Sequence, residues 1–120
     1  MSDMNRSEPL PVHFFRTATG NEPVREWLQN QDREDRKKIG EDLKTVQFAW
    51  PIGMPLVRNL GGGLWEVRTQ LRDRIARVFF AQYDQHIVLL HAIIKKSRQS
   101  PPDELALARQ RLGILRGRRL

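Results

Sequence analysis

The apolar residues in the first half of the chain recur with the period of an α-helix, and this pattern predicts two helices. A short helix follows Asn21, whose side chain is expected to cap the first turn. A longer helix of about five turns begins at Asp32 and ends at Trp50, because the residue before Pro51 is disfavoured in the α region. The apolar stripe of the first helix consists of Val24, Trp27 and Leu28, and that of the second consists of Ile39, Leu43, Val46 and Trp50.

In the second half, apolar and polar residues alternate with the two-residue period of β-strands. Strands are expected at 64–69, 74–82 and 86–95, and the short turn-like connections between them can join only antiparallel neighbours. The third of these strands is apolar on both faces and therefore belongs in the interior of the sheet. A short opening strand is predicted at 10–16, and the proline- and glycine-rich stretch 51–63 is predicted to be a loop.

A third helix is predicted near the end of the chain, where Ser100 provides a capping hydroxyl ahead of two prolines and an acidic residue. The resulting order is β-α-α-β-β-β-α. This order indicates a single α+β domain at 10–115, with an antiparallel sheet and its helices packed on one face. Residues 1–9 are expected to form a flexible N-terminus, and residues 116–120 a basic tail.

The charge of the chain narrows the range of partners. Lysine and arginine number 21 against 14 aspartate and glutamate residues, so the formal net charge is +7 and the pI is near 10.8. A polyanionic partner is the natural inference, although a solubilising surface excess gives the same net charge. The excess is concentrated between residues 57 and 99. The basic residues there are Arg58, Arg68, Arg72, Arg74, Arg77, Lys95, Lys96 and Arg98, and the acidic ones are Glu66, Asp73 and Asp84.

Several classes of chemistry are excluded. A chain without cysteine has no disulfide framework, thiol nucleophile or cysteine metal site, and its three histidines have no recognised metal spacing, so no cofactor is expected. The glycines at 61–63 precede a strand instead of opening a helix, which is not the geometry of a nucleotide-binding loop. With no secretory signal and no apolar run of about 18 residues, we expect a cytoplasmic protein without a membrane partner.

Candidate catalytic residues lie on the predicted strands. The strand period places Glu66 and Arg68 on the face opposite to the core-facing residues of their strand, and it places Arg77 on the same open face. Lys95 joins them from the last strand, with His91 nearby. Cationic side chains around one carboxylate suit a phosphodiester, because they stabilise the charge that develops on the phosphoryl oxygens.

Within this cluster Glu66 is a candidate proton acceptor for an attacking hydroxyl, which in RNA is the substrate's own 2′-OH, so that no metal is required. Two structural alternatives remain open. Glu66 and Arg68 or Arg77 can form a cross-strand ion pair, and His91 can be a hydrogen-bonded core residue.

Four segments occur in an order and at a spacing that resemble the phage-derived, HigB-like branch of the RelE/ParE toxin superfamily. They are the strand Gly63 to Arg68, the strand Arg74 to Phe80, the strand Ile87 to Lys96, and the helix start from Pro101 to Ala108. The resemblance extends from about residue 14 to residue 115 and implies the compact RelE-like, microbial-ribonuclease-like fold. It implies a type II toxin that cleaves translated mRNA in the ribosomal A site without a metal, and that is neutralised by a helix-turn-helix antitoxin, with which it can form a heterotetramer.

By position, the resemblance implies that Arg68 and Arg77 bind phosphate and stabilise the transition state, with Lys95 and Lys96 near the basic end of the last strand. The resemblance also implies that the basic residues Arg33, Arg36, Lys37 and Lys38 of the second helix face ribosomal RNA. The other residues that we expect to bind RNA are Arg58, Arg74, Lys96 and Arg98. The RelE prototype has a C-terminal tyrosine where this chain has Asp103 or Glu104, and a lysine where it has Glu66. Glu66 and His91 are therefore hypotheses for the base. A ParE-like gyrase poison and a non-catalytic phage-derived nucleic-acid-binding protein are the alternative functions.

Overall fold

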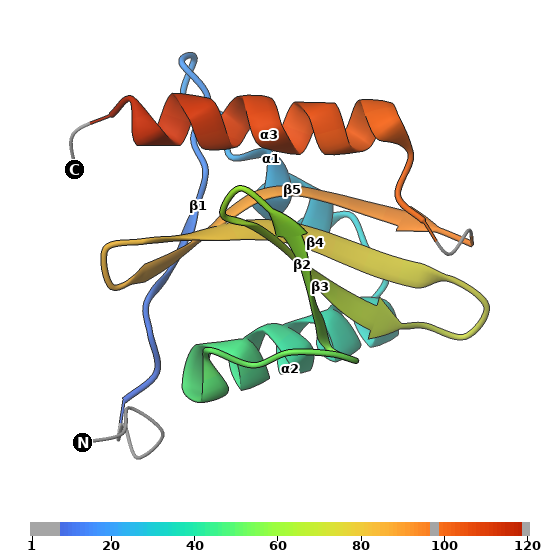
Figure 1. Ribbon diagram of the computed structural model, residues 1–120. Coiled ribbons are helices and arrows are strands. Elements are labelled where there is room, and N and C mark those ends of the chain that lie inside the picture. The colour runs from blue at the N-terminus through green and yellow to red at the C-terminus, as the bar shows by residue number, and fades with distance from the viewer. Residues whose placement is uncertain (1–7, 97–98, 119–120) are drawn as a thin grey trace.

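A five-stranded mixed sheet lies between helices on both of its faces in the computed structural model, which describes residues 8–96 and 99–118 (Figure 1). The strand order is β1-β5-β4-β3-β2, and β1 runs parallel to β5 while the other neighbours are antiparallel. The α+β class is confirmed, but the antiparallel sheet is corrected to a mixed one. The elements are β1 (Val12–Phe14), α1 (Pro23–Gln29), α2 (Arg33–Ala49), β2 (Val57–Gly61), β3 (Leu64–Gln70), β4 (Ile75–Tyr83), β5 (His86–Lys95) and α3 (Pro102–Arg116).

The predicted start of α2 is confirmed, and that of α1 is not. The Asp32 carboxylate accepts a hydrogen bond from the Asp35 amide at 2.8 Å, which satisfies one of the free N–H groups of the first turn. Helix α1 instead begins after Glu22 and has no side-chain cap. The Asn21 Nδ2 atom donates to the Thr19 hydroxyl in the preceding turn, at 3.4 Å.

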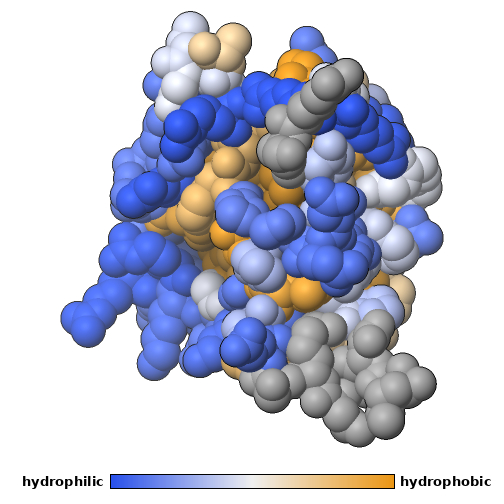
Figure 2. Space-filling view, turned by 90° about the vertical axis from the view of Figure 1, so that its left-hand side faces the viewer, coloured by the Kyte–Doolittle hydropathy of each residue, from blue (hydrophilic) through white to orange (hydrophobic). Residues whose placement is uncertain are grey.

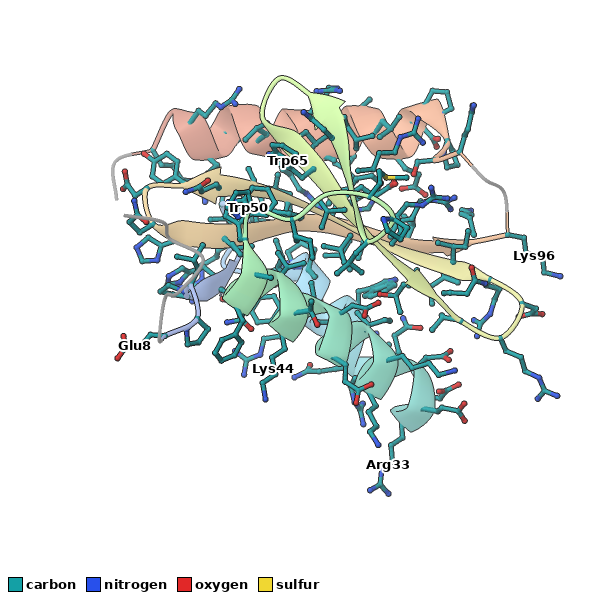
Figure 3. All side chains as sticks on the ribbon, turned by 60° about the horizontal axis from the view of Figure 1, so that its bottom comes forward. Glu8, Arg33, Lys44, Trp50, Trp65 and Lys96 are labelled. Atoms are coloured by element: carbon teal, nitrogen blue, oxygen red, sulfur yellow. The ribbon has the colours of Figure 1, made fainter. Side chains whose placement is uncertain are left out.

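Helices α1 and α2 cover one face of the sheet, and their apolar stripes fill the first half of the core. Ile39 and Val46 of α2 are completely buried against the sheet, as is Val24 of α1. Trp50, which ends α2, packs edge-to-face against Trp65 of β3 with ring centroids 4.9 Å apart (Figure 3). The strand residues on this face include Val67, Ala76, Val78, Phe80, Ile87 and Leu89.

Helix α3 covers the opposite face, which corrects the expectation that all helices pack on one side (Figure 1). Ala108, Leu112 and Leu115 of α3 lie on a second set of buried residues that includes Leu64, Phe79, Leu90 and Ile93. The sequence pattern does not indicate this second buried layer of the core, because the same faces of β3 and β4 also carry charged residues. When leucine and phenylalanine alternate with glutamate and arginine on one face of a strand, the period-two pattern indicates a solvent-exposed face.

Strand β2 occupies part of the stretch that was predicted to be a loop. It pairs with β3 so that Val57 faces Val67 and Arg58 faces Glu66. Gly61, Gly62 and Gly63 join the two strands with φ values of +88°, +65° and +88°, a conformation that other residues rarely adopt. The triple glycine is thus the turn of a tight hairpin.

A β-bulge interrupts β5 beside β4. Phe79 faces His91, whereas the next residue, Phe80, faces Leu89, so Leu90 is an extra residue in the ladder. Leu90 belongs to the core beneath α3, and the His91 ring stacks on Phe79 at 5.9 Å between centroids. Because of the bulge, the consecutive side chains of Leu90 and His91 both point toward α3.

Candidate functional site

Charged residues of three neighbouring strands gather on the α3 side of the sheet, with Glu66 at their centre. The pairing sets Arg58 opposite Glu66 and Arg68 opposite Arg77, so these four side chains share one face. The Arg77 Nε atom lies 3.6 Å from Glu66 Oε2, and the Arg68 Nε atom lies 3.7 Å from Glu66 Oε1. The sequence-based grouping of Glu66, Arg68 and Arg77 is therefore confirmed. We call these four residues the arginine–glutamate cluster.

Ser100, in the connection before α3, completes the cluster. It was predicted to cap α3, but the cap residue is Pro101 and makes no side-chain capping bond. The Ser100 hydroxyl instead donates a 2.7 Å hydrogen bond to Glu66 Oε2. The start of α3 is thereby tied to the centre of the sheet, a contact that no local sequence pattern indicates.

The cluster changes from buried to exposed across its width. Arg77 has 0% and Glu66 1% of its surface exposed, the Arg68 side chain has 21%, and Arg58 is exposed. The expectation of an open face for Glu66 and Arg77 is therefore wrong. An ion pair buried between a sheet and a helix has the same sequence signature as an exposed one, because alternation reports only which side a residue faces. The arginines that present charge to solvent are Arg68 and Arg58.

The electrostatics of the cluster follow from this burial. Burial lowers the pKa of the Arg77 guanidinium, Glu66 opposes that shift, and the charges of Arg68 and Arg58 lower the pKa further. An arginine nevertheless keeps its proton in a protein. Three cations thus share a single carboxylate, and the cluster attracts anions to the exposed arginines at its edge.

His91 lies in a separate network under α3. Its Nε2 atom is 2.7 Å from Glu104 Oε1, and its Nδ1 atom is 3.3 Å from Arg111 Nη1, which also donates to the Leu90 carbonyl at 2.9 Å. Because an arginine can only donate, Nδ1 is the acceptor and Nε2 carries the proton that bonds Glu104. Both ring nitrogens are engaged within the fold, which agrees with the structural alternative for His91.

The remaining predicted binding residues lie in several places. Arg74 is held by Asp35 of α2 at 2.8 Å and by Asp73 at 3.1 Å, and the bond to Asp35 raises the pKa of Arg74. Lys95 and Lys96 are exposed at the end of β5, and Figure 3 shows Lys96 pointing away from the sheet. Arg33, Arg36, Lys37 and Lys38 lie at the start of α2, and only Lys38 of these is half-buried. Arg98 falls outside the described residues.

Two arginines that the sequence did not single out hold the glycine hairpin against α3. Arg109 donates to the carbonyls of Leu60 and Gly61 at 2.7 and 3.1 Å. Arg116 donates to the Gly62 carbonyl at 2.7 Å. These bonds fix the β2–β3 hairpin, and with it Arg58, relative to the helix. The two arginines thus help to position the exposed side of the cluster.

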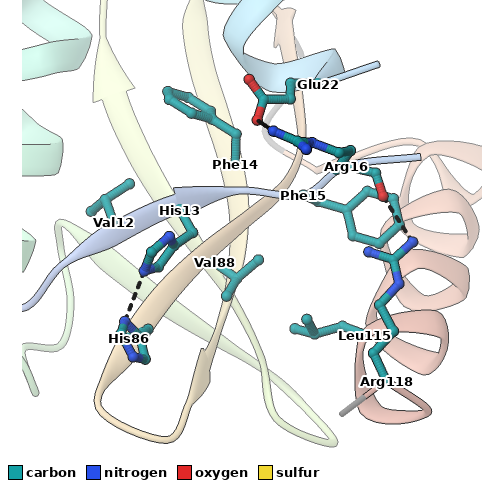
Figure 4. Close-up of a pocket in the computed structure, with 10 residues that line it drawn as sticks. All are labelled: Val12, His13, Phe14, Phe15, Arg16, Glu22, His86, Val88, Leu115 and Arg118. Atoms are coloured by element: carbon teal, nitrogen blue, oxygen red, sulfur yellow. Dashed lines mark hydrogen bonds and ion pairs between the residues drawn. The ribbon is translucent and has the colours of Figure 1, made fainter. Parts of the chain in front are cut away.

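A hollow of about 470 Å³ lies at the opposite edge of the sheet, beside β1 (Figure 4). Its apolar floor includes Phe14, Phe15 and Leu115, and the face that contains β1 shows hydrophobic surface between bands of hydrophilic residues (Figure 2). The His13 and His86 rings at its rim share a hydrogen bond of 2.8 Å. None of the predicted catalytic residues lines this hollow.

Within residues 8–96 and 99–118, no three histidine, aspartate or glutamate side chains converge as a metal site would require. Across the same ranges, no helix has both the length and the apolar character needed to cross a bilayer.

The fold and the cluster together define a small basic α+β domain with arginines arranged around one carboxylate, a site suited to phosphate groups. Residues 26–113 match the family model of the phage-derived Gp49-like proteins, DUF891. The chain therefore belongs to the Gp49-like family, which is RelE-like and is associated with the toxins of toxin–antitoxin systems. No curated protein matches the chain.

Proposed function

We propose that this protein is the toxin of a type II toxin–antitoxin pair, and that it acts as a ribosome-dependent mRNA endoribonuclease. The arginine–glutamate cluster is the observation that carries the proposal. In this cluster the partly exposed Arg68 and the exposed Arg58 lie beside the buried Glu66–Arg77 pair, in a basic domain of the Gp49-like family. This function requires a cytoplasmic location, with the ribosome and mRNA as partners. It also requires a helix-turn-helix antitoxin, which forms a heterotetramer with the toxin.

In the proposed reaction the 2′-OH of the substrate attacks the adjacent phosphorus. The new bond joins the 2′-oxygen to phosphorus, and the bond from phosphorus to the 5′-oxygen of the next nucleotide breaks. Water accepts the proton of the 2′-OH and supplies a proton to the departing 5′-oxygen, which gives a cyclic phosphate and a free 5′-OH. Arg68 and Arg58 bind the phosphoryl oxygens, whose negative charge increases in the transition state.

Glu66 acts in this scheme as a positioning residue. Its Oε2 atom accepts the Ser100 hydroxyl, and the carboxylate is 1% exposed, so it holds Arg68 and Arg77 in place beneath the phosphate. Rigid placement of arginines on paired strands is what electrostatic stabilisation of a transition state requires, because the groups then need no reorganisation during the reaction.

A second candidate function is non-catalytic binding of nucleic acid. The observation that favours it is the burial of Glu66 and Arg77, since a carboxylate and a guanidinium closed off from solvent contribute to an ion pair without touching a ligand. In this alternative the exposed basic residues bind phosphates and no bond is broken. A ParE-like action on DNA gyrase is a third outcome that the same experiment distinguishes.

Induced expression followed by mapping of mRNA 5′ ends tests these alternatives. Cuts in register with codons support the endoribonuclease, DNA damage with intact mRNA supports the gyrase poison, and harmless expression supports the binding protein. We expect Arg68→Ala to reduce cleavage by about 100-fold, the effect of removing one stabilising donor from a transition state. Arg25→Ala, which removes an exposed arginine of α1, is the matched control and should retain full toxicity.

Three further variants test the roles within the site. Arg77→Ala should also abolish toxicity, but it opens the core, so circular dichroism must show that the variant is folded. Glu66→Gln should reduce cleavage by disordering Arg68, whereas His91→Gln should retain it. Wild-type toxicity in both Arg68→Ala and Arg77→Ala would remove the cluster from the mechanism.

A further inference from the structure

A hollow of about 420 Å³ adjoins the arginine–glutamate cluster on the far side of Arg68. It lies where β3 ends and β4 begins, next to the segment that leads into β2. Arg68 forms part of its wall, so this residue belongs both to the cluster and to the lining of the hollow. The other lining residues are Asp42, Met54, Pro55, Leu56, Gln70 and Ile75. Its volume is in the lower part of the range for small-molecule sites.

The walls of the hollow combine apolar surface with hydrogen-bond acceptors. Met54 is 63% exposed, a large fraction for an apolar side chain, and with Pro55 it offers a flat, adaptable apolar contact. Asp42 of α2 contributes a carboxylate, which when ionised can only accept hydrogen bonds.

Gln70 is oriented so that its acceptor is available. Its Nε2 atom donates to the carbonyls of Leu71 and Arg74 at 3.0 and 3.3 Å, which fixes the carboxamide group. The Gln70 Oε1 atom has no hydrogen-bond partner among the described residues. The residues that line the hollow therefore include two kinds of acceptor, a carboxylate and an amide oxygen, together with apolar side chains.

We propose that this hollow binds the base of the nucleotide whose phosphate lies on Arg68, and that it favours bases with an exocyclic amino group. The inference rests on the proposed function, because it places an RNA phosphate on Arg68. Single-stranded RNA is read by apolar contact with splayed bases and by hydrogen bonds to their edges. Adenine, cytosine and guanine each offer an amino donor to Asp42 and Gln70, whereas uracil offers carbonyl acceptors on either side of its one N–H.

The binding test uses the methyl group of Met54 in the full-length protein. The chain has three methionines, and the other two are Met1 and Met4, so a Met54→Leu variant assigns the methyl resonance. Adenosine, cytidine, guanosine and uridine monophosphates are titrated in turn, with ribose 5-phosphate as the ligand without a base. We expect the methyl resonance to move with the three amino-bearing nucleotides, and uridine monophosphate to bind about tenfold more weakly.

Gln70→Ala should reduce the discrimination against uridine monophosphate, and Gln29→Ala, an exposed glutamine of α1, should leave it unchanged. A Met54 methyl that does not respond, that responds equally to ribose 5-phosphate, or that responds equally to all four nucleotides would overturn the proposal.

Cleavage mapping separates the failure of this inference from the failure of the proposed function. If the wild-type protein cuts mRNA, Gln70→Ala should cut more slowly and should lose the enrichment of amino-bearing bases at the cleavage site. Unchanged base enrichment in Gln70→Ala would refute the base site and leave the endoribonuclease intact. If the protein cuts no mRNA but the Met54 methyl discriminates among nucleotides, the endoribonuclease fails and the base site stands.

Discussion

Removing the Glu66 carboxylate is expected to destabilise the protein, because it takes away the counter-charge that faces the buried Arg77. At the observed separation of 3.6 Å, the attraction between the two charges is about 4–5 kcal/mol at an effective dielectric constant near 20. Breaking a buried pair by removing one partner typically costs about 3–5 kcal/mol. We therefore expect Glu66→Gln to lower the free energy of unfolding by about 3 kcal/mol, within the range that these two figures allow.

The assay is urea unfolding at neutral pH, combined in a double-mutant cycle with Arg77→Met. Replacing both charges removes the isolated cation as well as the pair, so the double variant should be more stable than the sum of the two single effects predicts, by about 2 kcal/mol or more. Glu41→Gln, on the exposed side of α2, is the matched control and should change stability by less than about 0.5 kcal/mol.

Single effects that add to within about 0.5 kcal/mol would refute the reasoning, because they would mean that Glu66 and Arg77 do not stabilise one another. The slope of the unfolding free energy against urea concentration should be the same in all variants. A changed slope would indicate that a substitution alters the unfolded state instead.

The remaining predictions concern the glycine hairpin and the Arg16–Glu22 pair. Gly63→Ala places a side chain at a φ of +88° and against the Arg116 guanidinium, so it should lower the free energy of unfolding in urea by about 1–2 kcal/mol. Gly113→Ala, inside α3, should instead stabilise the protein. Equal effects of the two substitutions would contradict the conformational argument. The hydrogen bond from Arg16 lowers the pKa of Glu22 below its ordinary value of 4.5, so the stability it gives is present above pH 4.5 and is lost as the pH falls through the folded pKa. Glu22→Gln should therefore differ from wild type at neutral pH and converge with it in acid, and a constant difference across the pH range would count against the assignment.

The sequence was sufficient for those features that depend on local chemistry. Asp32 begins α2 and Trp50 ends it because capping and the effect of Pro51 act over a few residues. The period of two placed Glu66, Arg68 and Arg77 on a common face, and it placed Val78 and Phe80 on the other.

Features that depend on tertiary packing were not predictable in this way. Strand β2 has only five residues, two of them the polar Arg58 and Asn59, and it is recognisable only through its pairing with β3. The bulge at Leu90 shifts the phase of β5, which no fixed period anticipates. Whether Glu66 is buried depends on Ser100 and α3, which are more than thirty residues away in the chain.

The pairing of β1 with β5 has a consequence for how the chain folds during synthesis. Residues 12–14 pair with residues 87–89, so the first strand must wait until β5 has been made. The layer beneath α3 closes later still, because Leu64, Phe79 and Leu90 are covered by the last helix. Early segments of such a chain cannot complete their contacts alone, and folding that relies on distant contacts is slow. The arginines that we assign to RNA therefore acquire their final positions only after α3 has been made.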